Sequence, residues 1–129
     1  MQEKIARLRE IKILFVEDEE DLITIISDTL TKLQANFKTA TNGQMALDIL
    51  KEDKDIQLVV TDINMPIMSG LELIEAYRKI DDKLKFVIMS AHTEPEYIKN
   101  AEDLGVTEYL LKPFDFIKFI NLVASLEIK

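Results

Sequence analysis

The chain has 129 residues, of which 47% are hydrophobic, 31% are charged and none is cysteine. This length and apolar fraction predict one globular domain with a substantial core, and the lack of cysteine excludes disulfides, thiolate chemistry and cysteine metal sites. The formal net charge of -8 disfavours sequence-independent binding to nucleic acid or to an anionic membrane. Because no apolar run is long enough for a membrane span and the first residues lack the apolar core of a signal peptide, we expect a cytoplasmic protein without membrane contact.

The first half of the chain alternates strand and helix patterns. Residues 1–10 mix charged and apolar residues, and we expect a short helical leader or a linker remnant before a domain spanning 11–129. Residues 11–16 predict a strand, which the acidic run 17–21 ends before a helix with apolar residues at helical spacing. Residues 36–40 predict a shorter strand, whose low apolar content indicates a sheet edge, and Asn42-Gly43 opens the next helix.

The second half continues the alternation. An apolar run from Leu58 stops at Asp62, and Met65-Pro66 cannot continue a strand because proline lacks a backbone donor and restricts the residue before it. Further strands are predicted at 86–90 and 108–111. Helices are predicted after Ser69-Gly70, from about Thr93 to Gly105, and after Lys112-Pro113-Phe114.

Five strands that alternate with helices predict an α/β fold, a doubly wound parallel sheet with helices on both faces. Parallel strands point the same way, so the residues just after them gather along one edge, where ligands bind in such sheets. The polar residues expected at that edge are Glu17, Asp18, Asp62, Ser90 and Lys112.

Three carboxylates beside one ammonium repel one another, and a divalent cation would neutralise them. The single histidine, His92, excludes a histidine-rich zinc site, whereas oxygen ligands suit Mg²⁺, with Mn²⁺ as a substitute. A carboxylate beside a metal, a lysine and a hydroxyl has the groups that phosphoryl transfer requires.

Four motifs at strand ends resemble the receiver domain of bacterial two-component response regulators of the chemotaxis-regulator type, over about residues 11–128. They are Leu14-Phe15-Val16-Glu17-Asp18, the run from Thr61 to Gly70, Ser90-Ala91, and the run from Tyr109 to Phe114. The resemblance implies a flavodoxin-like five-stranded sheet in the order 2-1-3-4-5. It also implies a phosphorylation-activated signalling switch rather than an enzyme with a released product.

The resemblance also implies roles for individual residues. Asp62 would accept the phosphoryl group, and Mg²⁺ would be held by Asp18, Asp62, the backbone carbonyl of Asn64 and, through water, Glu17. Phosphoryl binding would involve Ser90, Lys112 and Ala91, and the small side chain of Ala91 would leave room for Tyr109 to move inward. Further implied features are a switch pair formed by Ser90 and Tyr109, and a cis peptide between Lys112 and Pro113.

The implied partners are proteins. The donor would be a histidine kinase or a histidine phosphotransfer protein. The output would be a downstream protein or a second copy, bound through the last two helices and the strand between them. The last helix has more apolar residues than one packed face needs, so a partner or a neighbouring helix must cover the rest: Phe116, Ile117, Phe119, Ile120, Leu122, Val123 and Leu126.

Other functions remain open on the residues alone. An aspartate-nucleophile phosphatase of the haloacid-dehalogenase type needs a second acid two residues after the first, where this chain has Asn64. A second alternative is a receiver-like interaction module that works without phosphate. It is disfavoured because the residues for phosphoryl transfer are all present: Glu17, Asp18, Asp62 and Lys112. A flavin-binding function is the least favoured alternative, because the acids after the first strand would repel the phosphate of a flavin nucleotide.

Overall fold

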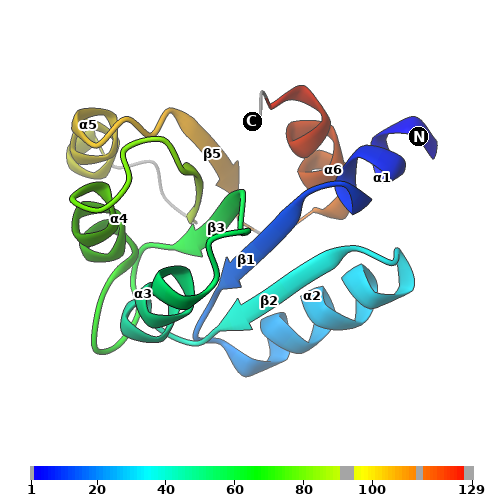
Figure 1. Ribbon diagram of the computed structural model, residues 1–129, viewed down its shortest axis with the longest axis horizontal. Coiled ribbons are helices and arrows are strands. Elements are labelled where there is room, and N and C mark those ends of the chain that lie inside the picture. Colours follow the sequence, from blue (N-terminus) through cyan, green and yellow to red (C-terminus); the bar gives the residue numbers. More distant parts are fainter. Residues whose placement is uncertain (1, 91–94, 113–114, 127–129) are drawn as a thin grey trace.

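The computed structural model describes residues 2–90, 95–112 and 115–126 and contains one five-stranded parallel sheet (Figure 1). The strand order is β2-β1-β3-β4-β5, which confirms the predicted fold class and places β2 at an edge. The strands are β1 (Lys12–Val16), β2 (Asn36–Ala40), β3 (Leu58–Asp62), β4 (Lys85–Ser90) and β5 (Glu108–Leu111). The helices are α1 (Gln2–Arg9), α2 (Glu20–Lys32), α3 (Gly43–Glu52), α4 (Gly70–Arg78), α5 (Pro95–Asp103) and α6 (Phe116–Ser125).

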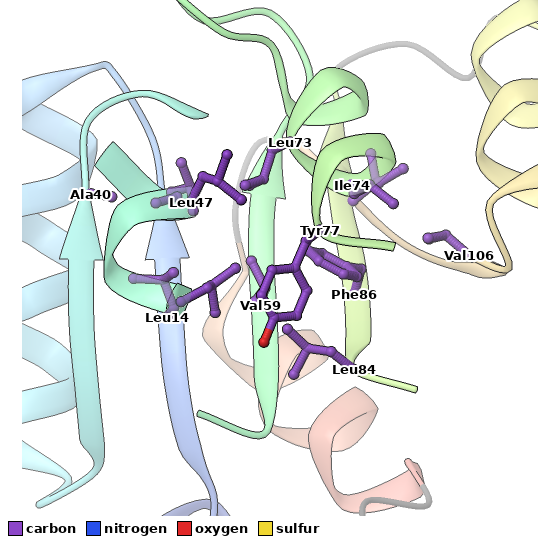
Figure 2. Packing of buried hydrophobic residues seen from close by; sticks show 14 of the residues in the cluster. Leu14, Ala40, Leu47, Val59, Leu73, Ile74, Tyr77, Leu84, Phe86 and Val106 are labelled. Carbon is purple, nitrogen blue, oxygen red and sulfur yellow. The ribbon is translucent and has the colours of Figure 1, made fainter. Parts of the chain in front are cut away.

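Alternating side chains of the strands build a core on each face of the sheet. In β1, Leu14 and Val16 enter one core, whereas Ile13 and Phe15 enter the other. The first core is covered by α3, α4 and α5, and Figure 2 shows helical residues such as Tyr77 packed over the sheet. The second core is covered by α1, α2 and α6. The three central strands are therefore buried on both sides, as a doubly wound sheet requires.

Side-chain caps fix where three helices begin. The Asn42 side chain accepts a hydrogen bond from the Met45 backbone N–H, and the Asp115 side chain accepts from the first turn of α6. Ser69 and Glu72 form a reciprocal capping box at the start of α4. Two of these starts, at Asn42-Gly43 and Ser69-Gly70, were predicted from local sequence because caps depend on neighbouring residues alone.

Helix α1 packs against α6, as Figure 1 shows. Leu8 is fully buried in the second core, and Lys4 Nζ donates a hydrogen bond of 2.7 Å to Asn121 Oδ1 of α6. Arg9 Nε donates to the Leu33 carbonyl oxygen at the end of α2. A neighbouring helix thus covers part of the apolar surface of α6, although Ile117 stays exposed. The domain boundary at residue 11 remains a prediction.

Asp53 joins α3 to the two strands at the β2 side of the sheet. Its Oδ2 lies 2.5 Å from Lys12 Nζ and 2.7 Å from Lys38 Nζ, and its side chain is only 10% exposed. The hydrogen bonds from these two lysines hold the pKa of Asp53 below its usual range. The ion pairs therefore favour the folded state when Asp53 is ionised.

Across the described ranges, we find no helix that is both long enough and apolar enough to cross a membrane.

Replacing Leu8 by alanine should lower the free energy of unfolding by about 3 kcal/mol, because a fully buried leucine loses its contacts and leaves a cavity. Urea unfolding of the whole chain measures the change. Glu3→Ala, at an exposed position of the same helix, is the control and should change stability by less than about 0.5 kcal/mol. Equal effects of the two substitutions would show that α1 adds nothing to the stability of the domain.

Asp53→Asn should lower the melting temperature at pH 7, because the two lysines lose an ionised partner. A carboxylate with a depressed folded-state pKa stabilises above its unfolded pKa, and that contribution is lost as the pH falls towards the folded value. The difference between wild type and variant should therefore shrink as the pH falls below about 4. Asp55→Asn, at an exposed neighbouring position, is the control. A difference that stays constant with pH would contradict the ion-pair explanation.

Candidate functional site

Strand β3 ends at Asp62, whose carboxylate and carbonyl group are both held by neighbouring groups. The Ile63 backbone N–H donates to Asp62 Oδ1 at 2.7 Å, and the Thr61 hydroxyl donates to the Asp62 carbonyl oxygen at 2.9 Å. A Cβ on Gly70 would lie 2.1 Å from that carbonyl oxygen. Position 70 therefore requires glycine, so that α4 can begin directly against the end of β3.

Strand β1 brings two further acids to the same edge. The Glu17 backbone N–H donates to the Ala40 carbonyl oxygen of β2, and the Glu17 side chain is only 1% exposed. The next residue, Asp18, is exposed, and its backbone N–H donates to Glu17 Oε2 at 3.0 Å. One acid is thus buried beneath the site, and the other faces solvent.

Lys112, directly after β5, connects the two acidic strand ends. Its Nζ donates to Glu17 Oε1 at 2.6 Å and to Asp62 Oδ2 at 2.8 Å. Its backbone N–H donates to the carbonyl oxygen of Ser90, the last residue of β4. The structure therefore gathers the five predicted polar residues at the ends of β1, β3, β4 and β5.

Burial and close charges shift the pKa values of this cluster. Burial raises the pKa of Glu17 to about 7, although the hydrogen bond from Lys112 acts in the opposite direction. Burial lowers the pKa of Lys112, but its hydrogen bonds to Asp62 and Glu17 outweigh that effect and leave the pKa raised. The raised pKa of Lys112 keeps its ammonium charged between the two carboxylates, and further positive charge near the three acids would offset their mutual repulsion.

The acids are close enough to share one cation. One oxygen from each of Glu17, Asp18 and Asp62 lies within 4.8 Å of the others. Hard carboxylate oxygens on an edge that is partly open to solvent suit a small divalent cation that keeps several of its waters. The donor set therefore fits Mg²⁺.

Of the other residues predicted for the site, the structure describes Asn64 and Tyr109. Asn64 is exposed two residues after Asp62, and Tyr109 is half-buried, with its hydroxyl donating to the Ile98 carbonyl oxygen at 3.4 Å. Ala91, His92 and Pro113 lie outside the described residues. The predicted cis peptide between Lys112 and Pro113 therefore also lies outside them.

Sequence reasoning missed two residues that support Asp62. Thr61 is fully buried, and we expected Gly70 to serve only as a helix start. In the sequence, Gly70 is marked only by its place at the first position of a predicted helix. Many residues are allowed at that position, so the place alone does not show that glycine is required. The need for glycine there depends on a contact with β3 that spacing does not reveal.

Comparison with known proteins agrees with this geometry. A family profile described as "Response regulator receiver domain" matches residues 13–124. Sporulation initiation phosphotransferase F of Bacillus subtilis is 32% identical over 104 residues, which cover 81% of this chain and 83% of that protein. Two-component response regulator ARR10 of Arabidopsis thaliana is 33% identical over 112 residues, which cover 86% of this chain. This chain spans about a fifth of the length of ARR10, since the match covers 20% of it.

Solved structures of protein complexes contain similar folds. One is the complex of the histidine phosphotransfer signalling protein Ypd1 with the receiver domain of Ssk1 from Saccharomyces cerevisiae. That match has a TM-score of 0.76 and 26% identity, and it covers 88% of this chain and 86% of the other. Another is the CheX-CheY-BeF₃-Mg complex from Borrelia burgdorferi, with a TM-score of 0.81, 25% identity, and coverage of 89% and 87%. The strand order, the edge cluster and these matches together show that the chain belongs to the response regulator receiver domain family.

Proposed function

We propose that this receiver domain is a phosphorylation-activated switch of a two-component phosphorelay, with Asp62 as the phosphoacceptor. The observation that carries the proposal is the convergence of Asp62 with Glu17, Asp18 and Lys112 at one edge of the sheet. The donor would be a phosphohistidine on a histidine kinase or a histidine phosphotransfer protein. Such a domain signals through a change in partner affinity and is not an enzyme with a released product. Its expected cytoplasmic location remains a prediction.

The transfer exchanges one bond for another. A carboxylate oxygen of Asp62 attacks phosphorus, and a P–O bond forms as the P–N bond of the donor breaks. The electron pair of the P–N bond leaves with the imidazole nitrogen. Lys112 Nζ, 2.8 Å from Asp62 Oδ2, is placed to pair with the phosphoryl charge, and the Ser90 hydroxyl would donate to a phosphoryl oxygen.

Glu17, Asp18 and Asp62, with the Asn64 backbone carbonyl, would hold Mg²⁺. When bound, the cation would supply positive charge that offsets the phosphoryl oxygens in the transition state. The similar fold in the CheX-CheY-BeF₃-Mg complex from Borrelia burgdorferi supports this assignment. Glu17, which is buried, would take part largely through water.

The output would pass through α5, β5 and α6. Ser90 ends β4, and Tyr109 of β5 is tied to α5 by its hydrogen bond to Ile98, so a shift of Ser90 towards the phosphoryl group would alter how these elements pack. A surface groove between β5 and α6 is lined by Tyr109, Leu110, Leu111, Lys118, Asn121, Leu122 and Ser125. A downstream protein or a second copy of the chain would bind this face.

Asp62→Ala should abolish phosphorylation by acetyl phosphate in Mg²⁺, because Asp62 is the more accessible of the two acids that contact Lys112 in the described ranges, with a side chain 14% exposed against 1% for Glu17. Intact-mass spectrometry should find one phosphoryl group on wild type and none on the variant. Asp55→Ala, at an exposed position, is the control and should be labelled like wild type. If wild type is never labelled, the chain is a module that works without phosphate, and turnover of unrelated phosphomonoesters would instead indicate a phosphatase.

Asp18→Asn should weaken Mg²⁺ binding by at least about tenfold, because the site loses an anionic oxygen from its most exposed acid. Calorimetric titration with MgCl₂ measures the dissociation constant directly. Asp21→Asn, an exposed acid three residues further on, controls for the general loss of negative charge. Removal of Mg²⁺ with a chelator should also stop labelling of wild type. Equal affinities of the two variants would place the metal elsewhere.

A further inference from the structure

Arg78, the last residue of α4, binds the end of the neighbouring helix α5 (Figure 1). Its Nε donates a hydrogen bond of 2.9 Å to the carbonyl oxygen of Leu104, the residue directly after α5. Carbonyl groups at the end of a helix have no partner within the helix and carry partial negative charge, so a guanidinium is a strong donor for them. The bond therefore joins two helices that are separate in the sequence.

The position of Arg78 is unfavourable for its own charge. The guanidinium carbon lies 5.0 Å from the centre of the Phe86 ring, and burial lowers the pKa of Arg78, although Asp81 and Asp82 act in the opposite direction. Nη1 is buried and makes no hydrogen bond to any described residue. Burial of a charged group with an unpaired donor opposes folding. An apolar side chain would pack on Phe86 without this penalty, so the contribution that only a donor can make is the bond to α5.

Helix α4 is firmly held in the fold, whereas α5 is held by few buried side chains. Leu73, Ile74 and Tyr77 of α4 are buried in the first core, and the Gly70 backbone N–H joins the start of α4 to the end of β3. Among the described side chains of α5, only Ala101 is buried. Few buried apolar contacts are typical of a segment that moves at low free-energy cost. The position of α5 therefore depends on polar contacts from neighbouring elements.

Two hydrogen bonds from neighbouring elements differ in strength. The Tyr109 hydroxyl of β5 donates to the Ile98 carbonyl oxygen over 3.4 Å, whereas Arg78 donates to the Leu104 carbonyl oxygen over 2.9 Å. The bond from Arg78 is shorter and its donor is charged, so it is the stronger of the two. We propose that Arg78 is the positioning residue that holds α5 in its unphosphorylated arrangement, and that phosphorylation of Asp62 moves α5 against this bond. The inference rests on the proposed function.

A restraint on α5 must also act on Asp62. Gly70 begins α4 against the Asp62 carbonyl, and about 12 Å of helix separates Gly70 from Arg78, so Arg78 does not touch a group bound at Asp62. Coupling between two sites is reciprocal, so a bond that favours the unphosphorylated position of α5 weakens the binding of a phosphoryl mimic. Loss of the bond should therefore strengthen that binding. A residue that only stabilises the fold would not have this effect.

The test uses beryllofluoride with Mg²⁺ as the phosphoryl mimic. Arg78→Met keeps a long side chain over Phe86 but removes the donor, and Arg78→Lys keeps a charged donor. Lys79→Met is the matched control, because it removes the same charge from the next residue, which is exposed. Fluorine NMR titration measures the affinity for beryllofluoride. Amide hydrogen exchange, followed by mass spectrometry, measures the opening of α5 before beryllofluoride is added.

Arg78→Met should bind beryllofluoride about fivefold more tightly than wild type, because α5 no longer resists the change. Without beryllofluoride, the amides of α5 should exchange about tenfold faster, while those of β1 and β3 keep their wild-type rates. Arg78→Lys should stay within about twofold of wild type in both measurements, because lysine can donate to the same carbonyl group. Lys79→Met should change neither measurement.

Several results would overturn the inference. Unchanged or weaker binding of beryllofluoride by Arg78→Met would do so, as would an equal change in Lys79→Met. Faster exchange in β1 and β3 as well as in α5 would also reject it, because Arg78 would then support the whole fold. In each of these cases wild type still binds beryllofluoride, and Asp62 remains the proposed phosphoacceptor. Failure of wild type to bind beryllofluoride in Mg²⁺ would instead reject the proposed function, and the inference with it.

Discussion

The two hydrogen bonds from Lys112 to Glu17 and Asp62 are the interaction on which the site depends. They join the ends of β1, β3 and β5, which are not all neighbours in the sheet, through one ammonium group. Glu17 is almost fully buried, so its carboxylate would be strongly disfavoured without a nearby positive charge. The same lysine that stabilises the buried Glu17 carboxylate is therefore placed to meet the charge of a phosphoryl group on Asp62.

At the other end of the sheet, where the strands begin, the contacts stabilise the fold. Lys12, at the start of β1, pairs with Asp53, and α1 inserts Leu8 into the second core while it contacts α6. These stabilising contacts lie near the beginnings of the strands, whereas the polar cluster lies at the ends of the strands. The separation allows the site to hold mutually repelling acids, because hydrophobic packing elsewhere supplies the stability.

Local signals in the sequence were enough for most of the fold. Strand periodicity, the Asn42 and Ser69 caps and the low apolar content of residues 36–40 all reflect interactions between near neighbours, and each matched the structure. The grouping of Asp62 with Glu17, Asp18 and Lys112 was also predictable, because the ends of parallel strands meet at one edge.

The sequence by itself determined that this protein is a parallel α/β domain with an acidic strand-end cluster, because periodicity and strand direction are encoded over a few residues. The tertiary structure alone decided which groups touch. It showed that α1 covers part of α6, that Lys112 bridges two particular carboxylates, and that Gly70 lies against the Asp62 carbonyl. The sequence shows which apolar and charged side chains need a contact. Which residue supplies that contact depends on how segments far apart in the chain are placed in space.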